Sequence, residues 1–245
     1  MLDSLDSEDF ISGIHNYCDR WCERCEFTNR CSVFAMEREF MDDNSSFDTD
    51  AMASKLESIF EDAKEMIVEK AEEFGLDETF ELSDEEFREI KDRKNRFIDG
   101  QELAALAKAY GFEAKTVLDS KEEWLAFSSI DEVTREDVLA VLYWYQFFIG
   151  AKIHRGFHGI LDDEGFEDAD EIRDPQSGAN GSIKIALIAV ERSILSWTYL
   201  LAAQNADYIR PMIQTLDRIK RMAEAKFPRA NDFVRPGFDE LGPVM

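Results

Sequence analysis

The sequence predicts an all-α protein, a bundle of five to six main helices with an N-terminal cysteine-rich metal-binding arm. Apolar residues recur at spacings of three and four along most of the chain, and helix-capping sequences precede several of these runs. No segment shows the alternation of a half-buried strand. The 245 residues, 44% of them hydrophobic, are enough for one large core.

The first predicted helix spans residues 51–74 and ends near Gly75, because apolar side chains there repeat every three or four positions among charged ones. Ser83 to Glu86 has the Ser-x-x-Glu form of a capping box and opens a second helix through about Asp99. The helical pattern continues past Gly100, which allows this second helix to extend to Tyr110.

The central helix, near residues 135–158, follows a weaker capping signal at Thr134. Its middle, 138–151, is apolar on every side, so we expect other helices to enclose it. The remaining predicted helices are a short one after a capping box at Ser120, bearing Trp124 and Phe127, an apolar one over 182–204 and an amphipathic one over 207–226.

Two segments lack a helical pattern. Residues 162–181 form an acidic, glycine-containing connection whose length indicates a functional or a disordered loop. The tail from Arg229 carries prolines and glycines and is expected to lie over the surface on Phe233 and Phe238. The chain is thus divided into a cysteine-rich segment, 1–45, a helical bundle, 46–228, and an irregular tail, 229–245.

The net charge of −25 argues against general binding to nucleic acids or to anionic membranes, because such a surface repels phosphate groups. The first residues show neither the basic nor the apolar region of a secretion signal. The apolar run from Val138 to Ile153 is shorter than the roughly 20 residues that span a bilayer. We therefore expect a cytoplasmic protein.

All four cysteines of the chain lie within 14 residues, as Cys18, Cys22, Cys25 and Cys31, in the pattern C-x3-C-x2-C-x5-C. In a reducing cytosol, clustered cysteines are more often metal ligands than disulfides. Thiolates select zinc, copper(I) or iron–sulfur clusters. One tight wrap with such uneven spacings suits a [4Fe-4S] cluster, whereas structural zinc usually takes two Cys-x2-Cys knuckles set further apart. Zinc is the alternative.

The first three cysteines have the C-x3-C-x2-C spacing of radical SAM enzymes. That resemblance implies a parallel (β/α) barrel with the motif after its first strand and one iron left open for SAM. This chain is predicted to be helical, shows no glycine-rich SAM segment and has Cys31 as a fourth ligand. The radical SAM activity is therefore not carried over.

The segment from Cys22 to Cys31 resembles the C-x2-C-x-[FY]-x3-C iron–sulfur staple of RecB-like and AddB-type nucleases. The resemblance covers about ten residues. In those nucleases the first staple cysteine lies far upstream, whereas Cys18 is local, and the chain lacks a strand-borne Asp and Glu-x-Lys core. The resemblance implies the cluster type and not the nuclease activity.

A second candidate site lies between the predicted helices 135–158 and 182–204. A glycine-rich turn, 177–181, feeds a helix N-terminus with Lys184 in its first turn, an arrangement that can hold an anion. Glu191 and Arg192 interrupt an otherwise apolar run. The pocket would be lined by Lys152, His154, Arg155, Ser182, Lys184, Glu191 and Arg192, and the alternative is an ion-pair network without a ligand.

Three functions stay open from the sequence. The first is an iron–sulfur protein serving redox chemistry, sensing or local folding, with an unknown protein or redox partner. The second is a zinc-stabilised helical interaction module. The third is a helical enzyme whose anion or small-molecule pocket lies between helices 135–158 and 182–204. No catalytic residue is identified.

Overall fold

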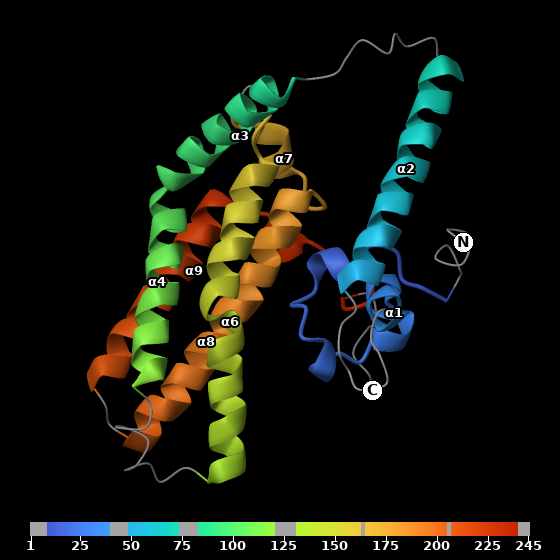
Figure 1. Cartoon of the computed structure of the whole chain (residues 1–245). Coiled ribbons are helices and arrows are strands. Elements are labelled where there is room, and N and C mark those ends of the chain that lie inside the picture. Colours follow the sequence, from blue (N-terminus) through green and yellow to red (C-terminus); the bar gives the residue numbers. More distant parts are fainter. Residues whose placement is uncertain are drawn as a thin grey trace. The chain divides into compact units, whose positions relative to one another are not determined.

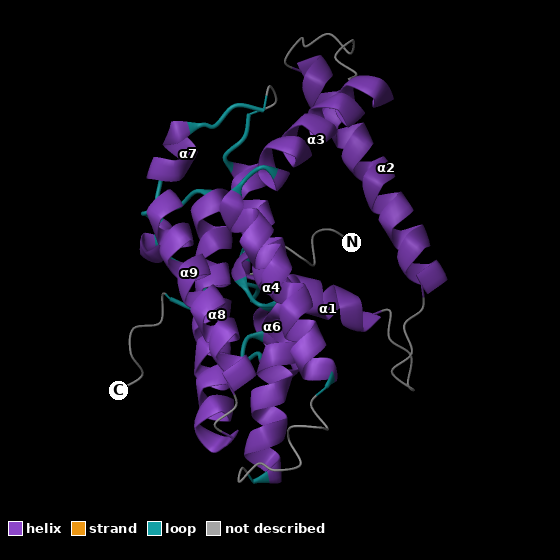
Figure 2. Cartoon of the chain, turned by 90° about the vertical axis from the view of Figure 1, so that its left-hand side faces the viewer, coloured by secondary structure: helices purple, strands orange, loops and turns teal. Residues whose placement is uncertain are grey.

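The computed structural model describes residues 9–39, 49–73, 83–120, 131–162, 165–204 and 207–239. Every regular element in these ranges is helical, apart from one isolated antiparallel bridge between Leu161 and Glu167 (Figure 2). The predicted all-α class is therefore confirmed. The predicted short helix with Trp124 and Phe127 lies outside the described residues.

The chain divides into two compact units. The first comprises residues 1–15 and 22–89, and the second comprises residues 16–21 and 90–245. The division into segments 1–45, 46–228 and 229–245 remains a prediction.

In the first unit, short turns lead into two helices. These elements are η3 (Cys22–Arg24), η4 (Thr28–Arg30), α1 (Ser32–Glu39) and α2 (Thr49–Glu73). The helix predicted over 51–74 corresponds to α2. The capping box is also confirmed: the Ser83 N–H donates to Glu86 Oε2 at 2.8 Å and the Glu86 N–H donates to Ser83 Oγ at 3.3 Å, at the start of α3 (Asp84–Asp99).

The second unit is built on four helices that pack in a ring. They are α4 (Glu102–Asp119), α6 (Glu132–Gly159), α8 (Gly178–Gln204) and α9 (Arg210–Lys226). α4 packs on α6, α6 on α8, α8 on α9, and α9 on α4, as Figure 1 shows. Their core is aromatic and aliphatic, and its largest fully buried side chains include Trp197, Tyr110, Tyr145, Phe157 and Phe227.

Two predicted helix boundaries are corrected. α3 ends at Asp99 and α4 begins at Glu102, so no single helix runs on to Tyr110; Gln101, with φ −83° and ψ 124°, breaks the helical backbone between them. α6 starts at Glu132, earlier than predicted, because the Asp131 carboxylate caps it by accepting the Thr134 N–H at 3.0 Å.

The middle of α6 is not enclosed, contrary to the prediction. Leu142 and Ile149 are fully buried, whereas Trp144 is 37% exposed and Phe147 is 44% exposed. α4 and α8 cover two sides of α6 and leave an aromatic stripe uncovered by the other bundle helices. Of these two side chains, Phe147 lines the groove described below.

The acidic connection 162–181 is ordered wherever it is described. It contains α7 (Ala169–Arg173), and its last residues form the first turn of α8. The fully buried Asn180 fixes it, because its Nδ2 donates to the backbone oxygens of Ile172 at 3.0 Å and Asp174 at 2.8 Å.

Candidate functional site

Three of the four cysteines lie in the first unit, in two tight turns. The Cys25 N–H donates to the Cys22 oxygen at 3.2 Å, closing η3. η4 follows, and the Cys31 N–H donates to the Thr28 oxygen at 3.4 Å just before α1 begins. The four cysteines of the chain are all partly exposed and form no disulfide.

The sulfur of Cys25 accepts a backbone hydrogen bond. The Phe27 N–H lies 3.4 Å from Cys25 Sγ, and the Phe27 side chain is buried. A peptide N–H directed at sulfur stabilises the thiolate, and in metal sites such bonds adjust the ligand's charge and the reduction potential. This turn therefore offers Cys25 Sγ the kind of hydrogen bond that sulfur ligands accept in metal sites.

Cys18 lies in the second unit, on the segment 16–21, which packs against the bundle helices. Trp21 stacks on Trp144 with ring centroids 5.1 Å apart, and the ring centroids of Tyr17 and Phe233 are 4.5 Å apart. Lys152 Nζ donates to the Asn16 oxygen at 3.4 Å. The backbone on both sides of Cys18 is thus fixed by aromatic and polar contacts.

Asp19 connects this segment to two bundle helices. Its Oδ2 accepts from the Tyr145 hydroxyl at 2.6 Å and from Arg192 Nη1 at 2.8 Å. Its backbone oxygen accepts from Trp144 Nε1 at 2.9 Å. Burial, together with the negative charge of Asp19, raises the pKa of Tyr145, so the phenol stays protonated and donates.

Arg20 has φ 59°, which is unusual for a residue with a Cβ. This left-handed turn lies between Cys18 and Cys22. Burial raises the pKa of the Cys18 thiol, while a backbone hydrogen bond from Arg20 and the Arg20 charge act in the opposite direction. A metal that binds this sulfur would have to displace its proton.

Among the residues that the structure describes, no three or more His, Cys, Asp or Glu side chains form a group arranged to hold a metal. Cys18 belongs to one compact unit, and Cys22, Cys25 and Cys31 belong to the other. The four-cysteine ligand set therefore stays a prediction from the sequence.

The polar groups of the predicted pocket between helices 135–158 and 182–204 are directed to separate partners. Lys184 Nζ donates to the Phe233 oxygen at 2.6 Å and pairs with Asp239 at 3.2 Å. Ser182 Oγ donates to the Gly178 oxygen at 2.8 Å within α8.

The two charges in the middle of α8 are also paired. Glu191 pairs with Lys220 of α9 at 2.7 Å, and Arg192 pairs with Asp19. Lys152, which is largely buried, contacts the Asn16 oxygen and the Phe148 ring. Among the described residues, the charged groups of the predicted pocket thus have partners outside it, on α9 and on the segment 16–21.

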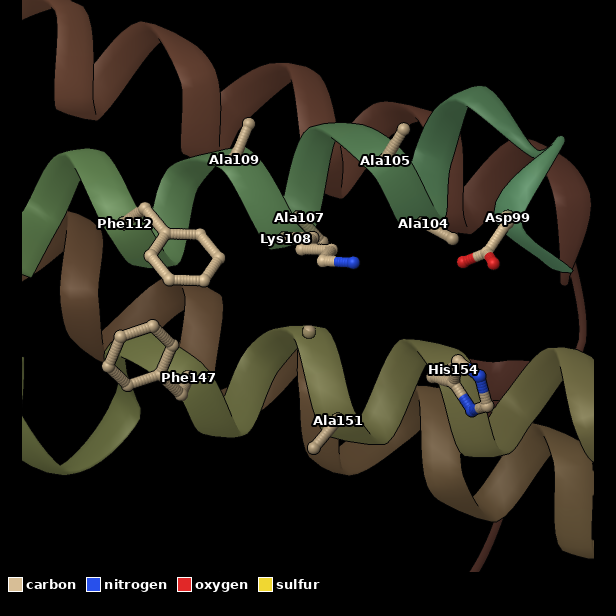
Figure 3. Close-up of a pocket in the computed structure, with 11 residues that line it drawn as sticks. Asp99, Ala104, Ala105, Ala107, Lys108, Ala109, Phe112, Phe147, Ala151 and His154 are labelled. Carbon is tan, nitrogen blue, oxygen red and sulfur yellow. The ribbon is translucent and has the colours of Figure 1, made fainter. Parts of the chain in front are cut away.

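A different groove, of about 770 Å³, lies between α4 and α6. His154 is the one residue of the predicted pocket that lines it, and Arg155 does not. Figure 3 shows Phe112 and Phe147 at one end, Asp99 and His154 at the other, and Lys108 between the two helices. The other lining residues are small: Ala104, Ala105, Ala107, Ala109, Gly150 and Ala151.

This groove was not predicted from the sequence. Phe112 and Phe147 belong to helical patterns in which an aromatic residue is expected in the core, and only the packing of α4 on α6 leaves them exposed. The one feature of the sequence that indicates a groove is the set of alanines in the segment that forms α4, since small side chains leave room between helices.

Comparisons with protein-family models, with curated proteins and with solved structures found no match. Among the described residues, Gly178–Ala203 of α8 is long and apolar enough to cross a membrane, but half of its most apolar window is buried inside the protein. Core helices of soluble proteins have the same length and composition, so this finding assigns no location.

Proposed function

We propose that this chain is a cytoplasmic metalloprotein that binds a [4Fe-4S] cluster through Cys18, Cys22, Cys25 and Cys31. The cluster would serve redox chemistry, sensing or local folding, together with an unidentified protein or redox partner. One observation carries the proposal: every cysteine of a 245-residue chain falls within 14 residues, at spacings that allow a single wrap.

Local geometry supports thiolate ligation. The Phe27 N–H directed at Cys25 Sγ is the kind of bond that stabilises a sulfur ligand. Cys22 and Cys25 lie at the two ends of one tight turn, which the Cys25 N–H closes by donating to the Cys22 oxygen. Trp21 and the buried Phe27 lie within the motif in the sequence, where apolar side chains reduce solvent access and so influence the potential of a cluster.

The test is anaerobic purification of the full chain, followed by absorption and EPR spectra and by iron, sulfide and zinc analysis. We expect a coloured protein with iron and sulfide in equal amounts, about four of each per chain, and an EPR signal on reduction. A colourless protein with one zinc per chain would contradict the iron–sulfur proposal.

Zinc is the second candidate, because Cys22 and Cys25 form a Cys-x2-Cys turn closed by a backbone hydrogen bond, as in structural zinc sites. In that case the chain would be a zinc-stabilised helical interaction module without redox chemistry. The same metal analysis distinguishes the two candidates.

Cys31→Ala tests whether all four sulfurs are ligands. We expect the variant to lose most of its metal, because Cys31 supplies the fourth thiolate after the η4 turn. Ser32→Ala, at the next position, is the matched control and should retain the metal. Full metal content in Cys31→Ala would show that three thiolates suffice.

A further inference from the structure

The groove between α4 and α6 has an aromatic end. The rings of Phe112 and Phe147 meet edge to face, with centroids 5.4 Å apart, and 57% of Phe112 is exposed. Alanines and Gly150 line the space beside them, so an apolar body can enter between the helices. Exposed aromatic rings that border a groove provide an apolar surface for a ligand.

The same groove carries two opposite charges. Lys108 lies between the helices, with its amine directed toward the end where Asp99 lies (Figure 3). Neither side chain forms an ion pair or hydrogen bond with any residue that the structure describes. By contrast, Lys115 on the same helix pairs with Asp119, and Glu102 pairs with Arg218.

From this arrangement we propose that the groove binds a zwitterion with an aromatic side chain, of the α-amino-acid class. The aromatic ring would contact Phe112 and Phe147, the carboxylate would pair with Lys108, and the ammonium would pair with Asp99. His154, beside Asp99, supplies a further polar contact. The site is independent of the cysteine motif and of the proposed metal.

Both charges are needed for this choice of ligand. A simple carboxylate would satisfy Lys108 and face the negative charge of Asp99, and a simple amine would satisfy Asp99 and face Lys108. A molecule carrying both charges on one carbon satisfies both residues and leaves its side chain for the aromatic end. The groove is therefore selective by charge pattern as well as by shape.

The test is isothermal titration of the purified full chain with three indoles: L-tryptophan, tryptamine, which lacks the carboxylate, and indole-3-propionate, which lacks the ammonium. We expect L-tryptophan to bind most tightly. Lys108→Met should weaken the binding of L-tryptophan about tenfold, because the carboxylate contact is lost, and should not weaken the binding of tryptamine, from which it removes a repelling charge. Asp99→Asn should weaken the binding of L-tryptophan similarly and should not weaken the binding of indole-3-propionate, for the same reason.

Phe147→Ala should weaken all three indoles, and Lys115→Met, the control on α4 outside the groove, should weaken none. All four changes are at exposed positions, so circular dichroism and urea unfolding should match the wild type apart from a small change in Phe147→Ala. The proposal is wrong if L-tryptophan does not bind in the low millimolar range. It is equally wrong if Lys108→Met and Asp99→Asn affect the three indoles alike.

Discussion

Tyr145, Asp19 and Arg192 form a connected polar cluster, and Asp19 is next to Cys18 in the sequence. The Asp19 carboxylate accepts from both other side chains, and the Arg192 guanidinium also donates to the Tyr145 hydroxyl. The Tyr145 ring itself is fully buried. Because a buried polar group without a partner is costly, each member depends on the others, and the segment next to Cys18 depends on all three.

Tyr145→Phe removes one hydroxyl from this cluster and leaves Asp19 and Arg192 paired. We expect the free energy of unfolding to fall by about 1–2 kcal/mol, since Asp19 and Arg192 each lose a buried partner. Amide hydrogen exchange in residues 16–21 should accelerate as well. Urea unfolding and exchange followed by mass spectrometry measure the two effects.

The control is Tyr199→Phe, at a half-exposed position on α8 whose hydroxyl makes no hydrogen bond to a described residue. It should change stability by less than about 0.5 kcal/mol. If Tyr145→Phe behaves like this control, the cluster does not fix the segment that carries Cys18.

At the scale of helices, α4 and α6 approach closely because one contact position has no side chain. A Cβ on Gly111 would lie 2.8 Å from the Gln146 backbone oxygen and 2.9 Å from a ring carbon of Phe147. Gly150, across the same pair of helices, is less confined, since a Cβ there would lie 3.6 Å from its nearest neighbours in Ala107. The interhelical distance is thus set at Gly111.

Gly111→Ala should destabilise the protein by about 1–3 kcal/mol, because the helices must separate or the Gln146 backbone must shift. Gly150→Ala is the matched control within the same interface, and we expect it to be neutral or stabilising by up to about 1 kcal/mol through helix propensity. Thermal or urea unfolding compares the two. Equal effects would show that α4 and α6 are not closely packed at Gly111.

At the scale of the whole bundle unit, the C-terminal segment is tied to the start of α8. Lys184 donates to the backbone oxygens of Asn231 and Phe233 and pairs with Asp239, which also receives hydrogen bonds from Arg235. Phe233 is buried, and its ring contacts Tyr17. These contacts join residues 17, 184 and 231–239, which are far apart in the sequence.

The Asp239 carboxylate makes this connection depend on pH, and Asp239→Asn removes that dependence. Partial burial opposes ionisation of Asp239, but hydrogen bonds from Arg235 and Lys184 outweigh it and lower the pKa to about 2 from 3.8. The ionised carboxylate therefore stabilises the fold above pH 3.8, and this contribution is lost as the pH falls from 3.8 toward 2. We expect the variant to be less stable by about 1 kcal/mol at pH 7, a modest value because solvent screens the site.

Urea unfolding of Asp239→Asn and the wild type at several pH values checks this. The stability difference should shrink as the pH falls through that window. Asp232→Asn is the control: it removes an exposed carboxylate that pairs with Arg229 in the same segment, and it should cost less than about 0.5 kcal/mol at pH 7. A difference for Asp239→Asn that is constant with pH would contradict the ion-pair account.

Local rules were sufficient for most of the helices. The apolar periodicity over 51–74, 182–204 and 207–226 predicted α2, α8 and α9 to within four residues at each end, because repeating side chains and caps act over a few positions. The first residue of a helix was harder to predict where two nearby residues are both able to cap it. Asp131, rather than Thr134, caps α6, since an aspartate oxygen accepts a backbone N–H at least as readily.

For the candidate sites, too, some features follow from the sequence and others from the tertiary packing. Ligand type and spacing are properties of the chain itself, so the cysteine motif and the expectation of a metal came from the sequence alone. Partners of Lys184, Glu191 and Arg192, and the groove between α4 and α6, depend on which helix faces meet. Those faces are selected by the packing of segments distant in the chain, and a pattern that repeats every three or four residues does not specify its neighbour.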